Sequence, residues 1–112
     1  MTSDINVPSD ADRLNRALGA IRAKFLTSRP DRLVALSQAA AEMDAETGNC
    51  ESLMLIRREC HKIAGLSGSI GYHALGELAG DIDIKIKDGR AGWDEIRPML
   101  HNLISYLENL EA

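Results

Sequence analysis

The sequence predicts an all-α protein, an antiparallel up-down-up-down four-helix bundle with an additional N-terminal helix packed across it or at one end. Three observations predict this class. No window alternates apolar and polar residues over the length of a strand, whereas apolar residues recur at spacings of three and four in most windows. The segments that interrupt this pattern are short, so neighbouring helices are expected to run antiparallel. The chain has 112 residues, the length of a single domain.

Composition excludes several classes of protein. A formal net charge of -4 and an aromatic content of 4% argue against a nucleic-acid binder, which usually carries a basic surface. No apolar run approaches the roughly 20 residues of a membrane helix, and Met1 to Asp10 lacks the basic-then-apolar pattern of a secretory signal. Cys50 and Cys60, ten residues apart on one predicted helix, would lie about 15 Å apart, beyond disulfide reach. The sequence therefore predicts a cytoplasmic protein with reduced cysteines.

The N-terminal third of the chain predicts a flexible tail over residues 1–8 and then two helices, within a single domain over residues 9–112. Ser9, followed three residues later by Asp12, resembles a capping box and is expected to start the first helix. Pro30 suits the first turn of a helix, where its missing N–H is tolerated, so a second helix is expected to begin there. The apolar stripes of these two helices are Leu14, Leu18, Ile21 and Phe25, and then Leu33, Leu36, Ala40 and Met43.

Three further helices are predicted in the rest of the chain. The third begins after Asn49 as N-cap and ends at Gly71, and the fourth runs from about Tyr72 to Lys87. The fifth contains Pro98, which must lie in its first turn or bend it. Their apolar stripes are Leu53, Ile56, Cys60, Ile63, Ser67 and Ile70; then Leu75, Leu78, Ile82 and Ile86; and finally Ile96, Leu100, Leu103, Leu107 and Leu110.

The third helix places a histidine away from its apolar stripe. At about 100° per residue, His61 lies roughly 120° from the centre of the stripe, so it should point to solvent or to a partner. Gly65 and Gly68 lie within about 40° of it on the following turns, and the three residues form one row. A glycine inside a helix costs roughly 1 kcal/mol relative to alanine. Either the row gives a partner clear access to the imidazole, or the glycines allow close helix packing or an early helix end.

Basic residues surround this histidine. Arg57 and Arg58 precede it by four and three residues, and Lys62 follows it. A neutral imidazole nitrogen is a good nucleophile toward phosphorus, and neighbouring cations would hold the negative charge of a phosphoryl group. The alternative interpretation of the three cations is an ordinary solvated helix face.

The segment from His61 to Gly71 resembles the signature of histidine-containing phosphotransfer (HPt) domains, and the similarity continues from Leu75 to Ala79. In that family the histidine is followed by an aliphatic residue two positions later and by glycines four and ten positions later. Those positions here are His61, Ile63, Gly65 and Gly71. One departure is Ala64, where many members have a lysine; the resemblance leaves Lys62, Arg57 or Arg58 to take over its role.

The resemblance implies a phosphocarrier of a two-component phosphorelay. His61 would accept a phosphoryl group from a receiver-domain aspartate and pass it to another receiver, with the partner supplying Mg²⁺. Its expected partners are response-regulator receiver domains and a hybrid histidine kinase. No GxxxxGK[ST] loop is present, so we expect no kinase activity, no ATP binding and no cofactor, and we expect a monomer that binds neither nucleic acid nor membrane. Gly65 and Gly68 would give clearance for docking, and Met54, two turns before His61, is the expected docking contact.

Two alternatives stay open. The first is a non-catalytic bundle that binds receiver or kinase domains without phosphotransfer. The second is a metal-binding bundle, in which His73 and Glu77, four residues apart, would share an ion; Glu-x-x-His pairs, which di-iron bundles use, are absent from the sequence. We expect no metal site.

Overall fold

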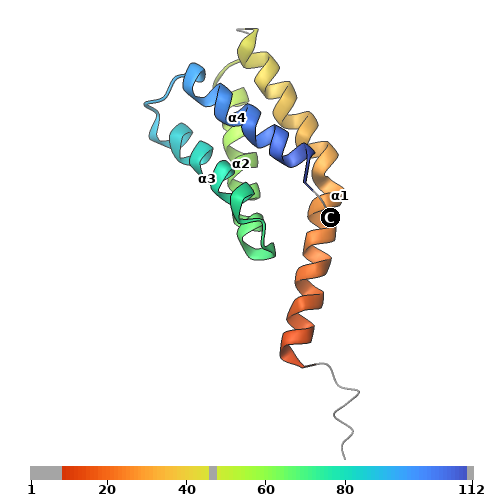
Figure 1. Cartoon of the computed structure of the whole chain (residues 1–112). Coiled ribbons are helices and arrows are strands. Elements are labelled where there is room, and N and C mark those ends of the chain that lie inside the picture. Colours follow the sequence, from red (N-terminus) through yellow and green to blue (C-terminus); the bar gives the residue numbers. More distant parts are fainter. Residues whose placement is uncertain (1–8, 46–47, 111–112) are drawn as a thin grey trace, which may run out of the picture.

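A computed structural model describes residues 9–45 and 48–110, which form four helices and no strand (Figure 1). The helices are α1 (Asp10–Asp44), α2 (Cys50–Ile70), α3 (His73–Asp88) and α4 (Trp93–Glu108). This confirms the predicted all-helical class. The predicted tail over residues 1–8 lies outside the described residues.

The helices pack in a ring, in which each helix contacts the next along the chain and α4 contacts α1. Arg22 of α1 donates to the carbonyl of Ile70 at the end of α2, and Arg32 lies 3.3 Å from Glu59 earlier in α2, so these two helices run in opposite directions. The residues of the enclosed core come from all four helices: Phe25, Leu36, Ala39, Ala40, Ile56, Cys60, Ile63, Ile70, Leu75, Ala79, Ile82, Ile86, Ile96, Leu100, Leu103 and Leu107.

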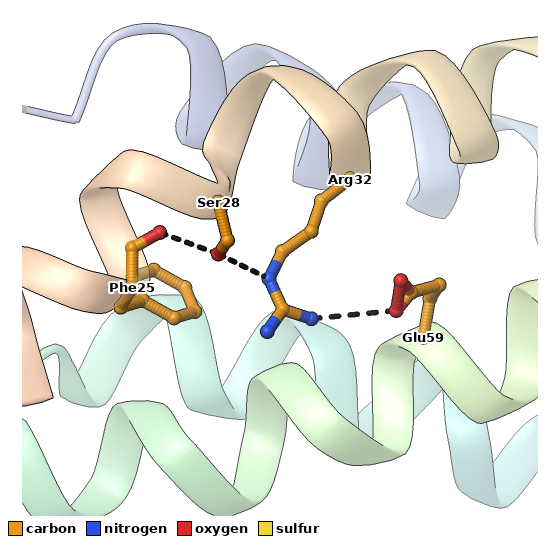
Figure 2. A network of polar contacts seen from close by, with 4 residues as sticks. All are labelled: Phe25, Ser28, Arg32 and Glu59. Carbon is orange, nitrogen blue, oxygen red and sulfur yellow. Dashed lines mark hydrogen bonds and ion pairs between the residues drawn. The ribbon is translucent and has the colours of Figure 1, made fainter.

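The two helices predicted before residue 45 are a single helix, which corrects the expected start at Pro30. Pro30 lies inside α1, where a proline removes a backbone hydrogen bond at a cost of about 3 kcal/mol. Contacts on both sides of the proline hold the helix together (Figure 2). Ser28 Oγ donates to the carbonyl of Phe25, and Arg32 Nε donates to Ser28 Oγ at 2.9 Å. The guanidinium of Arg32 also reaches Glu59 of α2 and lies over the ring of Phe25. Tertiary contacts therefore outweigh the local signal.

The sequence predicts a separate first helix packed across the bundle or at one end, whereas the structure shows its residues as the first half of the continuous α1. It extends past the ends of the other helices (Figure 1). Within the predicted stripe only Phe25 is buried; Leu18 packs against the edge of the core, and Leu14 and Ile21 are 58% and 40% exposed.

The predicted helix ends are largely confirmed. Ser9 Oγ accepts a hydrogen bond from the N–H of Asp12, and Asn49 Oδ1 accepts two from the first turn of α2. Gly71 ends α2 with φ of +90°, a conformation that favours glycine. Pro98 does not lie in the first turn of α4, which was one of the two placements left open: α4 begins at Trp93 and the proline falls in its second turn.

The cysteines agree with their interpretation from the sequence. Both are free thiols; Cys50 is exposed and Cys60 is fully buried in the core. Burial, with smaller contributions from the carboxylates of Asp83 and Glu59, raises the pKa of the Cys60 thiol to about 12. No helix in the described ranges is long and apolar enough to cross a membrane.

Candidate functional site

Helix α2 positions the predicted site by burying its opposite face. Its stripe from Ile56 to Ile70 is buried in the core, which leaves the His61 side chain 76% exposed. The orientation expected from the helical wheel is therefore the one observed.

A carboxylate from the neighbouring helix holds the imidazole. Asp83 Oδ2 of α3 lies 2.8 Å from His61 Nδ1, and its other oxygen lies 3.1 Å from Arg57 Nε. An ionised carboxylate only accepts hydrogen bonds, so Nδ1 carries the proton of the neutral ring and donates it. The lone pair is then on Nε2, on the exposed imidazole. The arrangement presents Nε2 as a nucleophile with a fixed tautomer.

Asp83 is a site residue that the sequence pattern did not predict. The available signal was weak: Asp83 follows the buried Ile82 directly, so it lies at the border of the buried stripe of α3. Its side chain is only 15% exposed, which is uncommon for a carboxylate without a partner. Recognising its partner requires the register between α2 and α3, which the sequence does not display.

The glycines near His61 fall into two groups. A Cβ built at Gly65 or Gly68 would meet nothing within 4 Å, and α2 continues beyond both to Ile70. Close helix packing and an early helix end are therefore wrong as explanations of these two residues. The glycine at which α3 packs closely against α2 is instead Gly76 of α3, where a built Cβ would lie 3.5 Å from Ser67 Cβ. Gly65 and Gly68 leave the backbone beside His61 bare.

The three basic residues predicted to support a phosphoryl group line one hollow of about 190 Å³ together with His61; they are Arg57, Arg58 and Lys62. Arg57 is partly buried and paired with Asp83, whereas Arg58 and Lys62 are exposed. Ala64, at the position where the sequence resemblance led us to expect a lysine, lies against α3, since its Cβ is 3.9 Å from a Cβ built at Gly80.

Exposed apolar side chains lie on both helices of the site. Met54 of α2, the predicted docking residue, is 37% exposed, and its neighbour Leu55 is 39% exposed. Ile84 of α3, which sequence analysis did not select, directly follows Asp83 and is 65% exposed. Met54 lies on the same face of α2 as His61 and Ile84 follows Asp83, whereas Leu55 lines a separate hollow with Glu42 and Ser52.

The pair considered for a metal, His73 and Glu77, is exposed. Within the part of the chain that the structure describes, no three His, Cys, Asp or Glu side chains come together as a metal-ion site.

Comparison with known proteins identifies the family. The family model described as Hpt domain matches residues 20–112, so the chain belongs to the Hpt domain family. Hpt domains are phosphotransfer modules of two-component systems, and they carry phosphoryl groups without kinase activity of their own. No curated protein and no solved structure matched the chain. The match begins within α1, so residues 10–19 of that helix lie outside it.

Proposed function

We propose that this chain carries phosphoryl groups in a phosphorelay, with Nε2 of His61 as the acceptor. The observation that carries the proposal is the exposed imidazole whose Nδ1 lies 2.8 Å from Asp83. This contact keeps the proton on Nδ1 and the nucleophilic lone pair on the accessible nitrogen. The family match and the bare backbone at Gly65 and Gly68 support the same interpretation.

The proposed step is an in-line displacement on an aspartyl phosphate of a receiver domain. The Nε2 lone pair forms a bond to phosphorus, and the bond from phosphorus to the aspartate oxygen breaks, with its electron pair going to the aspartate carboxylate. The phosphorylated ring keeps its proton on Nδ1 and carries a positive charge, which the Asp83 carboxylate stabilises. The reverse displacement passes the group to another receiver. The receiver supplies Mg²⁺ in this scheme, so His61 needs no cofactor from its own chain.

The cations are proposed to have two roles. Arg57 holds the Asp83 carboxylate through the oxygen that does not contact His61. The positive charge of Arg57 is therefore already offset by Asp83, and Arg57 acts as a positioning residue. Arg58 and Lys62 are exposed beside the imidazole and are the better candidates to contact the phosphoryl oxygens. They would fill the role of the lysine that this chain lacks at Ala64.

The receiver is proposed to dock over α2 and α3 around His61. Met54 and Ile84 would supply apolar contacts from the two helices, and Gly65 and Gly68 would let the receiver approach closely.

The proposed function is tested by incubating the full chain with a phosphorylated receiver domain. We expect acid-labile, alkali-stable label on the wild type and none on a His61→Gln variant. His101→Gln, at an exposed histidine of α4, is the matched control and should label normally. Label on the His61→Gln variant would contradict the assignment. Receiver binding without label on the wild type would favour the non-catalytic interaction module instead.

The role of Asp83 is tested separately, by an Asp83→Asn variant. We expect phosphotransfer to slow at least tenfold, because removing the partner that orients a functional histidine commonly costs 10–100-fold. Asp81→Asn, two residues away on an exposed position of α3, is the control. Nitrogen chemical shifts of His61 should show Nδ1 protonated in the wild type and a mixed tautomer in Asp83→Asn; unchanged shifts would exclude the positioning role.

A further inference from the structure

The first third of α1 has an apolar face that the other described helices cover only in part. Arg22 marks the level at which α2 ends, since it donates to the carbonyl of Ile70 at 2.8 Å. Residues 10–21 extend beyond that level, and we call this segment the overhang (Figure 1). Leu14 and Ile21 are 58% and 40% exposed on it. A helical segment of this length is marginal in water on its own, so an exposed apolar stripe along it points to a partner.

The spacing of the stripe is that of a coiled-coil seam. Ala11, Leu14, Leu18 and Ile21 are separated by three, four and three residues, the a/d spacing of a heptad repeat. The same face continues into the bundle, where Phe25 is buried. The ribbons of the other three described helices end short of the overhang (Figure 1), although Leu18 packs against the edge of the core and Ile21 lines a hollow with Leu66 of α2.

We propose that the overhang is a dimerisation surface that pairs antiparallel with the overhang of a second copy of this chain. In this register Leu14 of one copy packs against Leu18 of the other, and Ala11 packs against Ile21. Pairing residue 11 with residue 21 uses the whole overhang and places the two bundles at opposite ends of the helix pair.

Charged residues at the start of the overhang and just beyond its end favour this partner and this direction. Asp10 and Lys24 occupy equivalent heptad positions beside the seam, with Ala17 midway between them. In an antiparallel pair equivalent flanking positions face one another, so Asp10 of each copy lies near Lys24 of the other and the two small alanines meet close to the symmetry axis. A parallel pair would not bring Asp10 of either copy near Lys24 of the other. This proposal departs from the monomer that the sequence led us to expect.

The proposal is tested by sedimentation equilibrium of the full chain over a concentration series. We expect twice the mass of one chain at high concentration and dissociation on dilution. Leu14→Glu should raise the dissociation constant of the dimer at least tenfold. Val34→Glu is the matched control, because Val34 is 64% exposed on the same helix but beside the bundle, and it should leave the dimer unchanged. A monomer at every concentration, or equal effects of the two variants, overturns the proposal.

The direction of pairing is tested by cross-linking and charge exchange. Ala17→Cys in a Cys50→Ser background should form an intermolecular disulfide under mild oxidation, and Val34→Cys in the same background should not. Lys24→Asp should weaken the dimer, and adding Asp10→Lys should restore it. A dimer that forms no disulfide at Ala17→Cys overturns the antiparallel pairing. These measurements do not involve His61, so their failure is distinct from a failure of the proposed phosphotransfer.

Discussion

Replacing Gly65 should make the protein more stable and less active at once. Gly65 lies inside α2, and a Cβ there would meet nothing within 4 Å, so no clash offsets the gain in helix propensity. Gly65→Ala should therefore raise the free energy of unfolding by about 0.5–1 kcal/mol. For a domain of this size that corresponds to an unfolding temperature higher by roughly 2–6 °C, measurable by circular dichroism.

The same position should control access to the imidazole. Gly65 is one turn after His61 and within about 40° of it on the helix surface, so a long side chain there covers the approach to Nε2. Gly65→Gln should keep the stability gain in part and slow phosphotransfer from a receiver at least tenfold in a rapid-quench assay. If Gly65→Gln is more stable than the wild type and still transfers more slowly, the slower transfer comes from blocked access to Nε2 and not from damage to the fold.

Gly19 provides the matched control. It also lies inside a helix with nothing within 4 Å of a built Cβ, but on the overhang of α1. Gly19→Gln should leave the transfer rate unchanged. Transfer by Gly65→Gln at the wild-type rate would show that bare backbone is not needed beside His61. A lower unfolding temperature for Gly65→Ala would contradict the expected gain in helix propensity.

Two further predictions concern the buried face of α2. Ser67 is fully buried, and its Oγ has no hydrogen-bond partner among the described residues. Ser67→Ala should therefore leave the free energy of unfolding unchanged or raise it by up to about 1 kcal/mol. A decrease of more than that amount in urea unfolding would mean that the hydroxyl is hydrogen-bonded. Burial raises the pKa of the Cys60 thiol from 9.0 to about 12, so between these values the unfolded chain loses a proton that the folded chain keeps, and stability falls as pH rises, by at most about 1.4 kcal/mol per pH unit. Cys60→Ala should remove this component of the slope, and identical slopes for the two proteins would contradict the origin assigned to it.

Helix α2 could be predicted from the sequence because its determinants are local. Ile56, Cys60 and Ile63 are buried as their spacing indicates, and Asn49 and Gly71 bound the helix as expected. The exposure of His61 follows from the same periodicity, since a residue's angle on a helix is fixed once the buried stripe is known. The exposed position of His61 could therefore be predicted from the sequence alone.

Helix α1 shows where local rules fail. Proline is common in the first turn of a helix and costly in its interior, so Pro30 alone favours a helix start. Whether the chain continues through it depends on contacts made from elsewhere. Arg32, two residues after Pro30 in α1, supplies such a contact, because its guanidinium reaches Glu59 of α2, 27 residues away in the sequence. The overhang could not be foreseen for the same reason, because it exists only if α1 is unbroken.

Asp83 could not be found from sequence because its position beside His61 depends on how closely α3 approaches α2. Small residues set that approach: a Cβ at Gly80 would already lie 3.9 Å from Ala64, and one at Gly76 would contact Ser67. A lysine at position 64, which the sequence resemblance led us to expect, would start from the Cβ that lies against α3. We infer that Ala64 and the two glycines of α3 allow the close approach that brings the Asp83 carboxylate to the imidazole. The missing lysine and the carboxylate-held histidine are then consequences of one helix contact.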